Sequence, residues 1–208
     1  MKNELKLPEN TEIKASEVKG YKKIKPENGT TYADSKEFWN DKFSENSGEK
    51  VYYDDNGEKY RVGNELEPNA TFEKNGYTYN TDNEGRVVSV EGKLQLKDHD
   101  DRANMPDDRD VVARGKMLEG DHRGHLIADR FNGSGELENL VPMDAKLNTG
   151  DYAKLENTLA IALENGADVK MKVEPVYKDD SNRPDEIRVS YSIDGDKEVV
   201  VFKNGSDK

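Results

Sequence analysis

The chain has no cysteine among its 208 residues, so it can form neither a disulfide framework nor a thiolate zinc site. It also lacks any run approaching the roughly 20 apolar residues that a membrane helix needs. Its first residues have no apolar segment of the kind that marks a secretory signal peptide. Because only 32% of the residues are hydrophobic and 37% are charged, we expect a modest core and no membrane partner.

Positive charge is scarce as well: the chain has 32 Lys and Arg but 44 Asp and Glu, which gives a net charge of −12. Nucleic-acid binders normally neutralise phosphates with Lys and Arg, so this balance argues against a generic nucleic-acid binder. A bound divalent cation, however, reverses the field around it. A basic partner or simple solubility would also account for an acidic surface.

Two parts of the chain differ in pattern, and we predict a boundary between residues 1–70 and 71–208. The first part is an acid-rich extension in which Ser35–Phe43 favours a short helix and Asp54–Gly57 favours a hairpin turn. An equally weighted alternative is that both parts form one domain.

The second part predicts an α+β fold with antiparallel strands. Its helix is expected over Asp151–Asn165, where apolar residues recur at helical spacing, with Asp151 as the N-cap and Gly166 just past the end. Asp194–Gly195 has the composition of a hairpin turn. The expected strands are Tyr77–Asn80, Arg86–Val90, Lys93–Leu96, His125–Ala128, Val169–Tyr177, Glu186–Ile193 and Lys197–Lys203.

Four residues in order, His125, Asn139, Asn148 and Glu156, provide what a one-metal phosphodiester-cleaving site needs. Imidazole titrates near neutral pH and suits a general base, and an amide oxygen can bind a hard cation without adding charge. Asn148 and Glu156 are eight residues apart, which is about 12 Å along an ideal helix. If the helix begins after Asn148, Asn148 would bind the metal directly and Glu156 would act through a metal-bound water.

Three motifs carry a family resemblance: Arg123-Gly124-His125, Asn139-Leu140-Val141-Pro142 and the segment Leu147–Glu156. Together they resemble the DNA/RNA non-specific endonucleases of the ββα-metal (His-Me finger) class, over roughly residues 71–208.

The resemblance implies an antiparallel sheet with a ββα-metal motif crossed by the predicted helix. It implies that His125 is the general base, that Asn148 binds Mg²⁺, with Mn²⁺ as an alternative, and that Glu156 holds the water shell. Asn139 would shape the site by hydrogen bonding. Arg102 would lie near the scissile phosphate, and Arg123 belongs to the same catalytic set.

The chain departs from the family pattern at two positions. Many members have aspartate where this chain has His122, with Asp121 one position earlier, and many have glutamine where it has Met143. We interpret His122 as an exposed neighbour of the site. A zinc site of His122 and His125 with Asp121 or Asp129 is the disfavoured alternative, because no further His or Cys completes it except the distant His99.

The wider pattern is similar to the nuclease domains at the C-terminal ends of bacterial polymorphic toxins, often of the LXG type. That subgroup implies type VII secretion, a DNA or RNA substrate, a cognate immunity protein and action in the cytoplasm of a target bacterium. The alternative from another class is a catalytically silent binding module that keeps the fold. Metal-dependent cleavage would separate the two.

Overall fold

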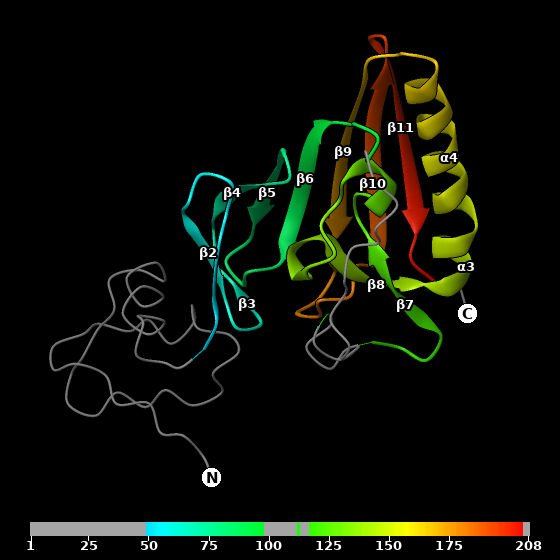
Figure 1. The fold of residues 1–208 in the computed structure, drawn as a ribbon. Helices are drawn as coiled ribbons and strands as arrows, with labels where there is room; N and C mark the ends of the chain where they lie inside the picture. Colours follow the sequence, from blue (N-terminus) through cyan, green and yellow to red (C-terminus); the bar gives the residue numbers. More distant parts are fainter. Residues whose placement is uncertain (1–48, 98–111, 113–116, 206–208) are drawn as a thin grey trace, which may run out of the picture.

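The computed structural model describes residues 49–97, 112 and 117–205, and these form an α+β fold as predicted. Its main sheet is antiparallel and six-stranded, in the order β11-β10-β9-β6-β5-β4 (Figure 1). The strands are β4 (Thr71–Lys74), β5 (Tyr77–Thr81), β6 (Val87–Lys93), β9 (Val169–Val176), β10 (Glu186–Ile193) and β11 (Asp196–Lys203).

Alternating burial shows that the main sheet has one core face. In β9 every second side chain from Val169 is buried, which is the period expected for a strand with one face in the core. The predicted hairpin turn at Asp194–Gly195 is confirmed, with φ of 51° and 97°. The separate strand predicted at Lys93–Leu96 is wrong. The strand β6 continues through Gly92 to Lys93 and pairs with β9, and Leu94 then turns into the core.

The helix α4 (Asp151–Glu164) confirms the predicted helix and lies along the sheet beside β11 in Figure 1. Its buried face includes Tyr152, Leu155 and Leu159, and Gly166 follows its end with φ of 85°. The predicted N-cap is wrong: Gly150 occupies that position, and Asp151 is the first helical residue, paired with Lys154.

A short helix, α3 (Ala145–Thr149), precedes α4 and changes the geometry expected for Asn148. Asp144 caps α3 by accepting hydrogen bonds from the backbone of Lys146 and Leu147. Gly150 lies between the two helices, and only glycine fits there because a Cβ atom would collide with the Lys146 carbonyl. Asn148 therefore lies inside α3, which the sequence did not predict, while the predicted helix does begin after Asn148.

A second, two-stranded sheet of β7 (Asp121–His125) and β8 (Leu140–Asp144) leads directly into these helices and forms the ββα motif. Gly124 allows the two strands to approach, because a Cβ there would lie 2.6 Å from the Met143 Cβ. The strand predicted at His125–Ala128 is wrong. The strand ends at His125, and the buried residues after it turn to bond with Asn139.

The three-stranded sheet is β1 (Val51–Tyr53), β2 (Lys59–Val62) and β3 (Glu65–Leu66). The hairpin turn predicted at Asp54–Gly57 is confirmed, and the Asp54 carboxylate accepts backbone hydrogen bonds inside it. Tyr60 and Leu66 from this sheet lie in the main core. The predicted helix at 35–43 lies outside the described residues, and the boundary at residue 70 stays a prediction.

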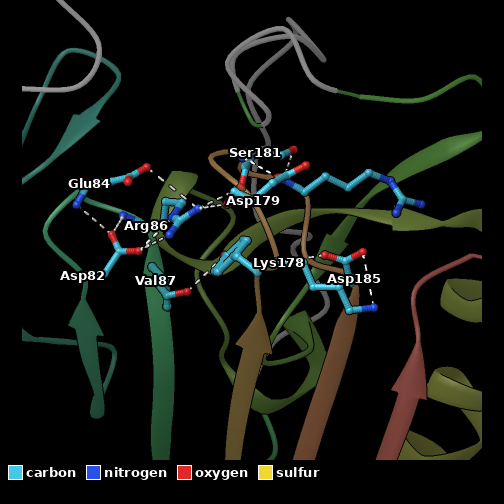
Figure 2. A network of polar contacts seen from close by, with 10 residues as sticks. Asp82, Glu84, Arg86, Val87, Lys178, Asp179, Ser181 and Asp185 are labelled. Carbon is cyan, nitrogen blue, oxygen red and sulfur yellow. Dashed lines mark hydrogen bonds and ion pairs between the residues drawn. The ribbon is translucent and has the colours of Figure 1, made fainter.

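One polar network fixes the loop between β9 and β10 (Figure 2). Arg86, after the β5–β6 turn, pairs with Asp82 at 2.7 Å and donates to the Asp179 and Ser181 carbonyls at 2.7 and 3.2 Å. Its guanidinium also lies over the Tyr177 ring, 4.6 Å from the centroid. The loop held in this way supplies the arginine that secures the start of β7.

Candidate active site

The strand β7 presents the predicted site residues at the edge of the ββα motif. His125 is the last residue of β7, half-buried and opposite Leu140 of β8. Arg123 is two residues earlier, so its side chain leaves the same face of the strand as His125. This common face is where a base and a phosphate-binding guanidinium could act on one substrate.

Asn139 fixes the backbone that follows His125. It is fully buried, and its amide oxygen accepts from the Ile127 N–H at 2.9 Å. Its amide nitrogen donates to the Ile127 and Ser134 carbonyls at 2.8 and 2.7 Å, while its own carbonyl accepts from the Leu126 N–H. These bonds use both donors of the side chain, so Asn139 holds the backbone that follows His125 in place.

The helix α4 contacts the same segment from another side. The Tyr152 hydroxyl donates to the Leu126 carbonyl at 2.7 Å, one residue after His125. Glu156 follows Tyr152 by four residues, so both side chains share one face of the helix. Burial raises the pKa of the Glu156 carboxyl to about 7, while the positive charge of Arg130 opposes this shift. Glu156 is thus a carboxyl group that can hold or release a proton near neutral pH.

Asn148 of α3 meets His122 of β7. The Asn148 Nδ2 lies within hydrogen-bond distance of the His122 Nδ1, at 3.2 Å, and His122 leaves the opposite face of β7 from Arg123 and His125. His122 is exposed, as interpreted from the sequence, but it also contacts the residue predicted to bind the metal. The two residues join the first strand and the helix of the motif through their side chains.

Two residues far along the chain hold this motif and were missed by sequence reasoning. Arg183 forms a two-pronged pair with the buried Asp121, from Nε at 2.7 Å and Nη2 at 2.9 Å. Asn204 donates to the Pro142 carbonyl and accepts from the Asp144 N–H, which fixes β8 just before α3. No local pattern marks either residue, because their partners are about 60 positions away in the sequence.

The remaining predicted residues divide into those the structure describes and those it does not. Arg102 and His99 lie outside the described residues. Asp121 is committed to Arg183, and Asp129 is paired with Lys97 at 2.8 Å, so neither is held ready as a ligand beside the histidines. Within residues 49–97 and 117–205, no three His, Asp or Glu side chains gather as a metal-holding group.

Comparison with known proteins assigns the family. The family model for DNA/RNA non-specific endonuclease matches residues 68–195. The chain therefore belongs to the DNA/RNA non-specific endonuclease family, and it is a nuclease, a phosphodiester hydrolase. The same region contains the whole ββα motif and every predicted site residue that the structure describes.

Among curated proteins, the type VII secretion system protein EssD of Staphylococcus aureus strain USA300 is 34% identical over 131 residues. The match covers 60% of this chain and 21% of that protein, and the EssD of strain Newman matches equally well. The chain thus spans about a fifth of the length of these curated relatives.

Two solved structures of NucA from Streptococcus agalactiae are also similar. The structure with no metal bound has a TM-score of 0.49 at 18% identity, covering 83% of this chain and 90% of that chain. The structure with a magnesium ion bound has a TM-score of 0.47 at 16% identity, covering 83% of this chain and 91% of that chain. In the part of the chain that the structure describes, no helix is long and apolar enough to span a membrane.

Proposed function

We propose that this domain cleaves DNA, and also RNA, with a divalent metal ion, using His125 as the general base. The observation that carries the proposal is the placement of His125 at the end of β7. The segment directly after it is fastened to Asn139 on one side and to Tyr152 of α4 on the other. A base must hold its position relative to the scissile phosphate, and these contacts provide that rigidity.

The donor set suits a hard or borderline divalent cation. Asn148 offers a neutral amide oxygen on α3, and Glu156 offers a carboxylate on α4. Mg²⁺ binds oxygen ligands, keeps several waters and rarely needs a full protein cage, so this sparse set fits it. The metal would stabilise charge on the phosphoryl and leaving oxygens. Asn148 would bind it directly and Glu156 through water.

The protein side chains divide the remaining work. His125 takes the proton of the attacking water, and its half-buried position limits its motion. Arg123, on the same face of β7, contacts the phosphate through its forked donors, and Arg102 is proposed for a similar contact. Asn139 and Tyr152 touch no substrate and keep the backbone beside His125 fixed. The products would carry 5′-phosphate and 3′-hydroxyl ends.

We further propose that the domain is the nuclease part of a secreted antibacterial toxin. Its similarity to EssD, a type VII secretion system protein, supports export by that route. A nuclease with this role acts in the cytoplasm of a target bacterium and requires a cognate immunity protein in the producing cell. Expression in a bacterial cytoplasm should degrade chromosomal DNA for the wild type and leave it intact for His125→Ala.

The direct test of metal dependence is cleavage of plasmid, single-stranded DNA and RNA in EDTA, Mg²⁺ or Mn²⁺. We expect cleavage only with metal, reduced about 100-fold or more by Asn148→Ala. The matched control is Asn165→Ala, an exposed asparagine at the end of α4, which should cleave like the wild type. Equal cleavage in EDTA, or full activity of Asn148→Ala, would contradict the proposal.

A further inference from the structure

His122 stands where many family members have aspartate, and the structure gives it a specific neighbour. Its Nδ1 atom lies 3.2 Å from the Asn148 side-chain nitrogen. A half-turn of the amide about its last side-chain bond exchanges nitrogen for oxygen at that position. The imidazole nitrogen and the amide oxygen would then be adjacent donor atoms, one from β7 and one from α3.

The separation of these atoms matches neighbouring ligands on one ion. Zinc–nitrogen and magnesium–oxygen bonds are both about 2.1 Å, which places adjacent ligands on the ion about 3 Å apart. Both side chains reach solvent, since His122 is exposed and Asn148 is half-buried. An ion can therefore approach the pair without any movement of the core.

The nearest carboxylate on the strand cannot take over this role. Asp121 is 2% exposed and receives two hydrogen bonds from Arg183, so its oxygens are directed toward the β9–β10 loop. The atom that contacts the Asn148 side chain is thus an imidazole nitrogen rather than a carboxylate oxygen. Imidazole favours borderline metals such as Zn²⁺ and Co²⁺, whereas Mg²⁺ prefers oxygen.

We propose that His122 is a direct metal ligand beside Asn148, and that this site binds Co²⁺, Mn²⁺ or Zn²⁺ in preference to Mg²⁺. The inference rests on the proposed function, which assigns the metal to Asn148. It differs from that function in giving the ion a nitrogen ligand and a different preference among metals.

The test measures metal binding without substrate. Calorimetric titration of the full chain with Co²⁺ and with Mg²⁺ would compare the wild type with His122→Ala, His122→Asp, Asn148→Ala and His125→Ala. We expect His122→Ala to weaken Co²⁺ binding about tenfold or more. His122→Asp should weaken Co²⁺ binding and strengthen Mg²⁺ binding, because it replaces nitrogen with oxygen. Far-ultraviolet circular dichroism would confirm that each variant is folded.

A second readout identifies the ligand atom. Pulsed electron paramagnetic resonance of bound Mn²⁺ detects a nitrogen bonded to the ion. We expect this signal in the wild type and in His125→Ala, and its loss in His122→Ala. A signal that is absent from the wild type, or that disappears with His125 instead, would overturn the assignment to His122.

The variants separate this inference from the proposed function. If Asn148→Ala abolishes Co²⁺ binding while His122→Ala changes it less than twofold, His122 is no ligand and the proposed metal residue still stands. If neither variant affects binding, both the His122 inference and the Asn148 assignment fail. Loss of binding in both variants, with the nitrogen signal dependent on His122, supports the inference.

Discussion

At the scale of single residues, the backbone beside His125 depends on Asn139, a buried side chain whose two amide donors are both used. Asn139 donates twice and accepts once within the core, and it fixes the segment after His125. The sequence motif predicts that this residue shapes the site. It could not show which groups it contacts, because Ile127 and Ser134 become its neighbours only when the loop closes on itself.

Replacing Asn139 with aspartate should destabilise the protein by about 3 kcal/mol. The substitution keeps the shape but directs a carboxylate oxygen at the Ile127 and Ser134 carbonyls, with no solvent to compensate. Urea denaturation would measure the loss. Asn157→Asp is the matched control: its exposed side chain already accepts from Arg130 at 2.6 Å, so stability should change by less than about 0.5 kcal/mol.

Glu156 should make the metal-free protein less stable as the pH rises. Burial raises the pKa of this carboxyl from its usual 4.5 to about 7 in the folded state. The folded state therefore holds the proton more tightly, and the free energy of unfolding falls between about pH 4.5 and pH 7. Above pH 7 Glu156→Gln should be more stable than the wild type by roughly 1–3 kcal/mol.

Urea denaturation in EDTA at pH 5.5 and pH 8 would test this effect. Glu164→Gln, at the exposed end of α4, provides the control for removing an acidic group from the same helix. If Glu156→Gln is less stable than the wild type at pH 8, or keeps the full pH dependence of the wild type, the raised pKa of Glu156 does not cause that pH dependence.

At the scale of elements, hydrogen bonds from Arg183 and Asn204, which follow the ββα motif in sequence, hold its strands in place. The β9–β10 loop, held by Arg86, brings Arg183 to Asp121 at the start of β7 (Figure 2 shows the loop contacts). Asn204, after β11, secures β8 next to α3. The motif is continuous in sequence from β8 to α4, but its alignment relies on residues that follow it.

Arg183→Leu should cost about 3–5 kcal/mol, because it leaves the buried Asp121 carboxylate without its cation. Asp121→Asn should reduce that cost when combined with Arg183→Leu, giving a non-additive double-mutant cycle. Thermal and urea unfolding of the four proteins would measure the coupling. If the stability losses of the two single variants add up in the double variant, the interaction between Arg183 and Asp121 contributes nothing to stability. Arg188→Leu, exposed on β10, is the control for losing an arginine.

The regular elements could be predicted from the sequence, and the breaks between them could not. The sequence located β9, β10 and α4 nearly to the residue, and in β9 and α4 the buried residues recur with the period of the element. The strand β7 ends at His125, where the next two backbone N–H groups donate to Asn139, which is more than ten residues away. A contact of this kind forms only when the chain folds and leaves no periodic signal in the sequence.

At the scale of the whole molecule, the three-stranded sheet is joined to the nuclease core through a buried charge network. Arg61 pairs with Glu136 at 2.8 Å and lies 3.6 Å from Glu138, whose carboxylate is fully buried and also accepts from Ser134. Ser134 is the residue whose carbonyl accepts from Asn139. The sheet before residue 68 therefore supports the loop beside His125, although it precedes the family match.

A chain that begins at residue 68 should be less stable than the full chain by several kcal/mol. It would lose Arg61 and the buried Tyr60, leaving Glu138 as an uncompensated charge. Glu138→Gln should then restore part of the stability of the short chain, while destabilising the full chain. Urea unfolding of the full and short chains, each with and without Glu138→Gln, would test whether the substitution has opposite effects on stability in the two chains. Equal stability of the short and full chains would support a nuclease domain independent of the first 70 residues.

The proposed function makes His125 the base of a metal-dependent nuclease. This role can be measured as the rate at which the purified chain nicks supercoiled plasmid in Mg²⁺ or Mn²⁺, beside His125→Ala with and without added imidazole. We expect a loss of about 100-fold or more for the variant, partial recovery with imidazole, and no cleavage in EDTA. Cleavage by His125→Ala at the wild-type rate would contradict it.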